Sequence, residues 1–115
     1  MERAYAEPST GHGKRYLVDR LWPRGVKRDA LHIEGWLQDV APSEKLRQWF
    51  GHDPKRWVAF KTRYLAELHA NKEALAPLVA AVAHGPVTLV FGAKDEERNN
   101  AVVLRAYLLG TPERS

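Results

Sequence analysis

The feature that most constrains the fold is a short apolar run near the carboxyl end of the chain. The run Val87-Thr-Leu-Val-Phe91 follows the chain-breaking pair Gly85-Pro86 and ends at Gly92. Unbroken runs of β-branched and aromatic residues are typical of strands that are buried on both faces, as in parallel sheets covered by helices. The run therefore predicts a buried strand, and the rest of the chain must supply the neighbouring strands and the covering helices.

The amino-terminal part of the chain supplies the partner strand. The segment Lys14-Arg-Tyr-Leu-Val18 is rich in residues that favour β-structure, and a short edge strand is expected at Arg3–Ala6. Between Val26 and Val40 the pattern is weak. Some apolar residues there have helical spacing, but Gly35 argues against a helix.

Helix signals fill the region between the two main strands. Ser43 has the character of an N-cap, Gly51 that of a helix stop, and Asp53-Pro54 that of a second helix start. Pro77 is expected to kink the next helix or to begin a new piece of it. The predicted helices span residues 43–50, 54–71, 72–83 and 99–109. We therefore predict one α/β domain over residues 1–115, with a parallel or mixed sheet covered by helices in a three-layer-like arrangement.

The composition excludes several classes of function. The chain has no cysteine, which rules out disulfides, a thiol nucleophile and a thiolate metal site. Its apolar runs are too short to cross a bilayer, and its first residues do not have the pattern of a signal peptide. We expect a cytoplasmic protein with no membrane partner and no metal site. The net charge of +4 favours anionic partners, while any cofactor and the oligomeric state stay open.

The candidate site is where the loops after the two main strands meet. Residues 19–25 form a basic loop, and residues 92–100 form a loop rich in acidic residues. In open α/β sheets, ligands gather at the carboxyl ends of the strands. We therefore predict that these loops bind a small anionic or nucleotide-like ligand, and we leave catalysis open. The candidate residues are Asp19, Arg20, Trp22, Arg24, His52, Lys94, Asp95, Asn99 and Asn100.

The same residues allow two other interpretations. Arg20 and Arg24 could form ion pairs with the acidic residues 95–97 and hold the loops together without binding anything. Alternatively, Asp19, Asp95 and Glu96 could supply oxygen ligands for a divalent cation such as Mg²⁺. The neighbouring lysines and arginines disfavour this second interpretation, because they would repel a cation.

Four ordered motifs give the chain a resemblance to a known family. They are Val18-Asp-Arg-Leu-Trp-Pro-Arg-Gly25, Trp36-Leu-Gln-Asp-Val-Ala-Pro-Ser43, Trp49-Phe-Gly-His-Asp53, and Val87-Thr-Leu-Val-Phe-Gly-Ala-Lys-Asp95 with Asn99-Asn-Ala-Val-Val-Leu104. Together they resemble the YeaO-like family of small uncharacterised bacterial proteins. The resemblance covers the chain from about Ala4 to Leu109.

What the resemblance implies for chemistry is limited. It brings no reaction with it, so no catalytic role passes to any residue of this chain. Longer relatives of the family look as if they carry cysteines in the loop and helix start after the last strand. This chain has Ala93 and Asn99-Asn100 in that region, so thiol chemistry does not extend to it.

DNA binding is the alternative function. Residues 44–69 have the order of a helix-turn-helix, with a short helix, a turn at Gly51 and a longer second helix. The basic residues that could contact phosphates are Lys55, Arg56, Lys61 and Arg63. A third hypothesis, an interaction module, predicts a large exposed apolar patch around Trp22 or Trp36.

Overall fold

Four short parallel strands form the centre of the protein. A computed structural model describes residues 1–3, 13–95 and 97–109. Within these residues the strands lie in the order β1-β4-β2-β3, and each neighbouring pair is parallel. The strands are β1 (Glu2–Arg3), β2 (Lys14–Leu17), β3 (Gly35–Trp36) and β4 (Val87–Phe91). The fold is therefore α/β with a parallel sheet, as predicted.

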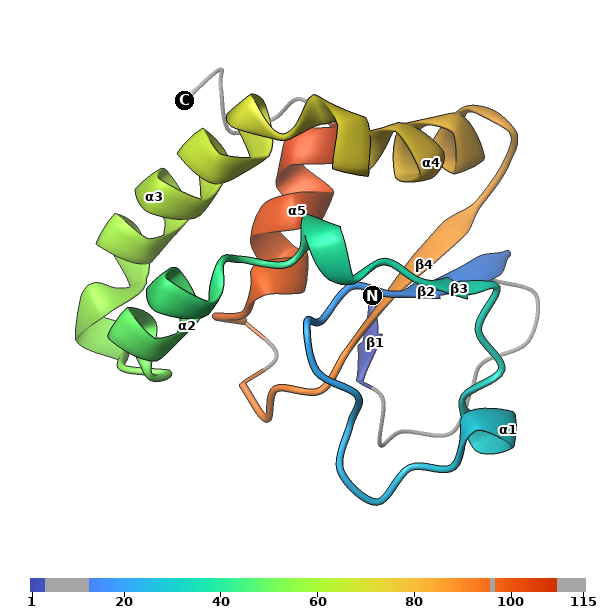
Figure 1. Cartoon of the computed structure of the whole chain (residues 1–115), viewed down its shortest axis with the longest axis horizontal. Coiled ribbons are helices and arrows are strands. Elements are labelled where there is room, and N and C mark those ends of the chain that lie inside the picture. Colours follow the sequence, from blue (N-terminus) through green and yellow to red (C-terminus); the bar gives the residue numbers. More distant parts are fainter. Residues whose placement is uncertain (4–12, 96, 110–115) are drawn as a thin grey trace.

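Helices cover the two faces of the sheet unequally. The α-helices are α1 (Arg28–Leu31), α2 (Glu44–Phe50), α3 (Trp57–Ala70), α4 (Lys72–Ala83) and α5 (Asn100–Leu109). Single 3₁₀ turns, η1 and η2, occupy Gln38–Val40 and Pro54–Arg56. Figure 1 shows α4 and α5 on one side of the sheet and the single turn of α1 on the other. None of the helices in the described ranges is long and apolar enough to cross a membrane.

Alternating side chains of the central strands enter two separate apolar clusters. Leu89 and Phe91 of β4 pack into the main cluster with residues of α2 to α5. Val90 and Leu17 point to the opposite face, where they pack with Leu31 of α1. Residues 88–91 of β4 are thus buried, and side chains on both faces of this strand have apolar cover.

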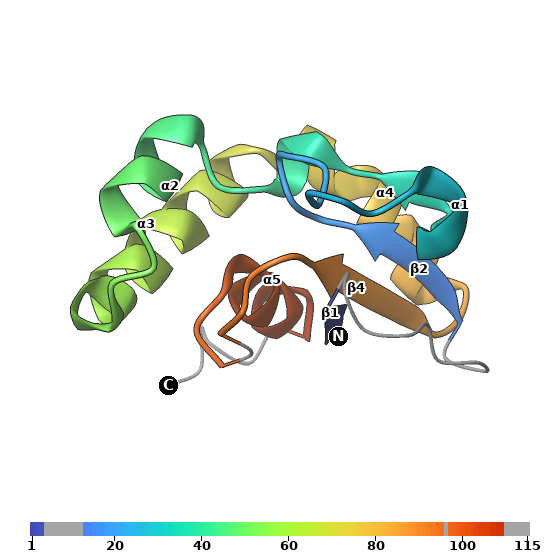
Figure 2. The same cartoon turned by 90° about the horizontal axis from the view of Figure 1, so that it is seen from below.

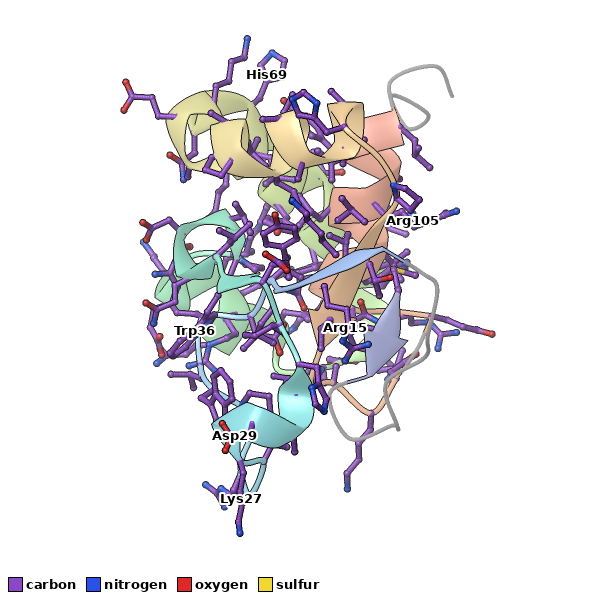
Figure 3. All side chains as sticks on the ribbon, turned by 90° about the vertical axis from the view of Figure 1, so that its right-hand side faces the viewer. Arg15, Lys27, Asp29, Trp36, His69 and Arg105 are labelled. Carbon is purple, nitrogen blue, oxygen red and sulfur yellow. The ribbon has the colours of Figure 1, made fainter. Side chains whose placement is uncertain are left out.

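Arg15 fastens the smaller layer to the sheet. Its side chain is buried, and its Nε donates a hydrogen bond to the carbonyl oxygen of Leu31 at 3.2 Å. Figure 3 shows Arg15 beside the sheet, Asp29 on α1, and Lys27 before α1 projecting away from the body of the protein. A charged residue of β2 therefore binds the end of α1, where a purely apolar contact would leave that carbonyl unsatisfied.

The predicted capping residues are confirmed. Ser43 precedes α2, and its hydroxyl accepts a hydrogen bond from the Leu46 N–H at 3.2 Å. Gly51 ends α2 with φ of +53°, a left-handed conformation that favours glycine. Asp53 caps the 3₁₀ turn that leads into α3, accepting from the Lys55 N–H at 3.0 Å. These local signals fixed the helix boundaries to within a residue or two.

The secondary structure of the weakly patterned segment 26–40 differs from the one that its sequence suggested. The helical spacing that the sequence suggested near its end is wrong, because Gly35–Trp36 is a strand and residues 38–40 form a 3₁₀ turn. Strand β3 exists because it pairs with β2, with Tyr16 opposite Gly35. The helix around Pro77 is one continuous helix, and both Pro77 and Glu73 lie on its exposed side. The expected edge strand at Arg3–Ala6 is described only to Arg3, and the rest lies outside the described residues.

Candidate functional site

A pocket of about 250 Å³ lies at the carboxyl ends of β2 and β4. The loop after β2 and the loop after β4 both contribute to it, and α2, α3 and the turn between them complete its wall. Seven of the nine predicted site residues line it: Asp19, Arg20, Trp22, Arg24, His52, Asn99 and Asn100. The two strand-end loops therefore line one pocket, and their position after parallel strands predicted that they would lie together.

Asp19 is the hydrogen-bonding centre of this site. Its Oδ2 accepts from the Gly92 N–H at 2.7 Å, and its Oδ1 accepts from Nδ2 of Asn100 at 3.1 Å. The same Asn100 amide also donates to the Val18 carbonyl at 3.0 Å. Burial raises the pKa of Asp19, although these hydrogen bonds and the charges of His52 and Arg47 oppose the shift. One carboxylate thus joins the ends of both central strands to the start of α5.

Two tryptophans support the same loop from the side of the smaller cluster. Trp36 Nε1 donates to the backbone carbonyl of Asp19 at 2.7 Å, and Trp22 Nε1 donates to the Val26 carbonyl at 2.7 Å. Their rings meet edge to face with centroids 5.4 Å apart. Both side chains are half-buried against Leu17, Leu31 and Val90. Figure 3 labels Trp36 next to this layer. Trp22 and Trp36 therefore pack as parts of the fold and do not form a large exposed patch.

The arginines of the first loop have different surroundings. Arg20 donates from Nε to the Pro42 carbonyl at 3.2 Å and from Nη2 to the Ala41 carbonyl at 3.5 Å. Arg24 is exposed at the pocket, and among the described residues nothing forms a hydrogen bond or ion pair with it. The suggested pairing of these arginines with the acidic loop is therefore wrong for Asp95 and Glu97, while Glu96 lies outside the described residues.

The second loop binds mainly to itself. Asp95 accepts hydrogen bonds from the Glu97 and Arg98 N–H groups at 2.9 and 3.0 Å, and its side chain pairs with Arg98 at 3.4 Å. These bonds lower the pKa of Asp95. Asp95 and the exposed Lys94, which were also predicted to bind the ligand, do not line this pocket. The Asp95 carboxylate is hydrogen-bonded within its own turn, and among the described residues no bond joins it to the loop after β2.

Asn99 connects this turn to α5. Its side chain is buried, donating from Nδ2 to the Asp95 carbonyl at 2.8 Å and accepting from the Val102 N–H at 3.1 Å. The second bond is that of an N-cap residue, which satisfies one of the unpaired N–H groups at a helix start. Asn99 therefore lines the pocket while holding the helix start in place.

The far wall of the pocket comes from residues that the sequence did not reveal as site residues. Arg47, Phe50 and Phe60 line it beside His52, which has φ of +58° in the turn after α2. The rings of Phe50 and Phe60 stack with centroids 4.3 Å apart. The amphipathic spacing of α3 predicted that Phe60 is buried, but spacing within one helix does not show which loop the ring will face.

The magnesium interpretation lacks a common site in the described structure. Asp19 and Asp95 belong to separate hydrogen-bond networks, one between segments and one within a turn. In residues 1–3, 13–95 and 97–109, no three His, Asp or Glu side chains gather as a metal site requires. The pocket lining is instead mainly basic, aromatic and amide in character.

Comparison with known proteins identifies the family. The model of a family described as the inactive DUF488-N3 subclade matches residues 1–115, so the chain belongs to this family. It is 36% identical over 107 residues to the uncharacterized protein YeaO of Escherichia coli, covering 93% of each chain. It is also 40% identical over 108 residues to uncharacterized proteins of Mycobacterium tuberculosis and Mycobacterium bovis, covering 94% of this chain and 91% of each relative. No solved structure matches it.

The family assignment agrees with the resemblance seen in the four motifs, which also indicated YeaO-like proteins. The matches extend over more than nine-tenths of the chain, so they include both pocket loops and the α2–α3 wall.

Proposed function

We propose that the pocket binds a small anionic, nucleotide-like ligand, and that the protein acts by binding and not by catalysis. The observation that carries the proposal is the lining itself. Three arginines and one histidine face a single acidic side chain, Asp19, among the described lining residues. Arginine binds phosphate and carboxylate groups through its forked N–H donors. The aromatic side chains in the lining, Trp22, Phe50 and Phe60, add apolar surface that suits an organic group such as a nucleobase better than a bare inorganic anion.

Arg24 is the best candidate for the anion contact. It lies at the pocket without a bond to any described residue, so its donors are available. Arg47 also lines the pocket but forms an exposed ion pair with Glu44. Arg20 donates to two backbone carbonyls, and we assign it to holding the loop against the segment before α2. A ligand that arrives can therefore bind Arg24 without first breaking a contact of the protein.

A role without catalysis is supported by two observations. The family is described as an inactive subclade. Ala93 and Asn99-Asn100, where the resemblance implies thiol-bearing residues in longer relatives, all line the pocket. Alanine supplies no nucleophile, and the Asn99 amide is engaged at both ends in the helix cap. In this chain, the pocket positions that would hold thiol groups in longer relatives are therefore occupied by Ala93, Asn99 and Asn100, which leave a surface for binding only.

A thermal-shift screen tests the proposal directly. Nucleoside mono-, di- and triphosphates, inorganic phosphate and the uncharged nucleosides serve as probes, followed by calorimetry for any that raise the Tm. We expect nucleotides to bind and Arg24→Ala to weaken binding about tenfold or more, because a charge-assisted hydrogen bond is lost. The Tm of the free variant should stay unchanged, since Arg24 is exposed.

Lys94→Ala is the matched control, because it removes one exposed positive charge from the neighbouring loop but not from the pocket. It should leave the affinity within about twofold. The proposal is wrong if none of the probes raises the Tm of the unmodified protein, or if both variants weaken binding equally.

A further inference from the structure

The end of the molecule formed by α2 and α3 is positively charged. Residues 44–70 contain six Lys or Arg and three acidic residues, a net charge of +3 out of the +4 of the whole chain. Figures 1 and 2 both show α2 and α3 side by side at one end of the molecule, away from the sheet. Since the remainder of the chain has 12 Lys or Arg and 11 acidic residues, a net charge of only +1, an anionic partner is attracted to this end.

Two tryptophans at this end hold cations over their rings. The Arg63 guanidinium carbon lies 4.0 Å from the centre of the Trp49 ring, and that of Arg56 lies 5.2 Å from the same ring. The Lys61 ammonium lies 5.6 Å from the centre of the Trp57 ring. These distances are within the range of cation–π attraction, so the rings restrict where the cations lie.

Arg56 and Arg63 differ in what else they bind. Arg56 donates to the Trp49 carbonyl and lies 3.9 Å from the Asp53 carboxylate, so it is fixed between α2 and the turn. Arg63 is exposed, and no hydrogen bond or ion pair joins it to a described residue. Its guanidinium is thus oriented by the indole while its N–H donors stay available. Lys45, also exposed, precedes Trp49 by four residues and lies on the same side of α2.

We propose that this cationic face, made of Lys45, Trp49, Arg56, Lys61 and Arg63, binds single-stranded nucleic acid without sequence preference. A base can stack on a guanidinium plane that an indole already supports, while the N–H edge contacts a phosphate. Unpaired bases offer their flat faces for such stacking, whereas a duplex hides them. An acidic peptide would be attracted by the positive charge of this face, but it has no bases to stack on the guanidinium groups.

The arrangement also distinguishes this proposal from the helix-turn-helix hypothesis. In that motif, side chains of the second helix project into the major groove and read base edges. Here Lys61 and Arg63 of α3 lie over tryptophan rings. None of the charged residues of the cationic face lines the pocket, so the proposal is independent of the ligand proposed there.

Fluorescence anisotropy with a labelled oligothymidine of about fifteen nucleotides tests the proposal on the full chain. We expect binding at low salt that weakens as salt is added, with a log–log slope of about −0.7 per phosphate contacted. Arg63→Gln should weaken binding about tenfold, because it removes both a stacking plane and a charge. Lys72→Gln on α4 removes one exposed charge elsewhere and should change the affinity by less than about twofold.

Arg63→Lys separates stacking from charge. It should keep the salt slope and still weaken binding, because an ammonium has no plane for a base. Circular dichroism checks that each variant stays folded, which we expect because Arg63 is exposed. Four results would overturn the proposal: no binding at low salt, equal loss in Arg63→Gln and Lys72→Gln, tighter binding of a duplex of equal length, or displacement by polyglutamate as effective as by unlabelled strand.

Discussion

Asp19 and Asp95 each belong to a loop that follows a central strand, yet their carboxylates have different kinds of partner. Asp19 binds the Gly92 N–H and the Asn100 amide, which are 73 and 81 residues away along the chain. Asp95 binds the N–H groups of Glu97 and Arg98, two and three residues away. The first carboxylate joins separate parts of the fold, and the second shapes only its own turn.

The difference shows how the pocket is held. The turn at Asp95 can form from local contacts alone, since an aspartate readily bonds the backbone two or three residues on. The bonds of Asp19 exist only when β2, β4 and α5 are together, and they are partly buried. Asp19 therefore joins the basic loop to both ends of the acidic loop, at Gly92 and Asn100, whereas the turn at Asp95 between those ends is held by its own bonds.

The largest loss of stability is expected for Asp19→Ala. The change leaves the Gly92 N–H and the Asn100 amide without their acceptor, at a cost of about 1–3 kcal/mol for each unsatisfied donor. Removing a carboxylate that is costly to bury offsets part of this, so we expect a net loss of about 1–3 kcal/mol. Urea unfolding followed by circular dichroism measures it. A loss no greater than that of Asp95→Ala would remove the contrast between the two loops.

Asn99→Ala should have the next largest effect. The buried amide caps α5 and holds the Asp95 carbonyl, and loss of an N-cap costs about 1–2 kcal/mol. The same unfolding experiment measures the loss, with Ser43→Ala at the start of α2 as a second cap for comparison. If Asn99→Ala leaves the unfolding free energy unchanged, the Asn99 side chain does not stabilise the start of α5.

The two carboxylates should respond oppositely to pH. Burial raises the pKa of Asp19 from its ordinary value of 3.8, and hydrogen bonds from the Glu97 and Arg98 N–H groups lower that of Asp95 from the same value. A raised pKa means that the folded state holds the proton more tightly. The contribution of Asp19 to the unfolding free energy therefore falls as the pH rises from 3.8 through its raised pKa.

For Asp95 the sign is reversed, and its contribution is lost as the pH falls from 3.8 through its lowered pKa. Urea unfolding over a pH series measures both trends. The destabilisation by Asp19→Ala should shrink toward neutral pH, and that by Asp95→Ala should shrink toward acid pH. Parallel trends would contradict the assignment of one buried and one exposed carboxylate.

Asp95→Ala should change overall stability least, because its bonds are local and exposed. Its expected effect is on the loop itself. Limited trypsin digestion should cleave faster after Lys94 and Arg98 in this variant, while the unfolding midpoint stays close to that of the unmodified protein. Unchanged cleavage would mean that the turn holds without its aspartate.

Sequence patterns predicted the fold where the signals are local. The apolar composition of residues 87–91 predicted a buried strand. Ser43 and Asp53 mark helix starts by their capping side chains, and Gly51 marks a helix end by its left-handed conformation. Strand β3 could not be predicted this way, because Gly35–Trp36 has only two residues and becomes a strand through pairing with β2. Local patterns do not show which distant strand will provide the hydrogen bonds.

The sequence could predict that the two strand-end loops lie together, but not every residue that lines the pocket between them. Strand order placed the two loops together, and seven predicted residues line the pocket. Lys94 and Asp95 were predicted to bind the ligand because their side chains suit one, yet neither lines the pocket, and Asp95 is hydrogen-bonded within its own turn. Arg47 and Phe60 line the pocket through the packing of α2 and α3, a long-range arrangement that sequence spacing does not specify.

The edge-to-face contact of Trp22 and Trp36 has a practical consequence. Indoles this close couple their excited states, and coupled transitions give paired circular-dichroism bands of opposite sign. Because Trp22 lines the pocket and its centroid lies 5.4 Å from that of Trp36, a ligand that moves the ring changes those bands. The Trp22–Trp36 pair thus provides a label-free optical signal for any movement of the Trp22 ring in the pocket wall.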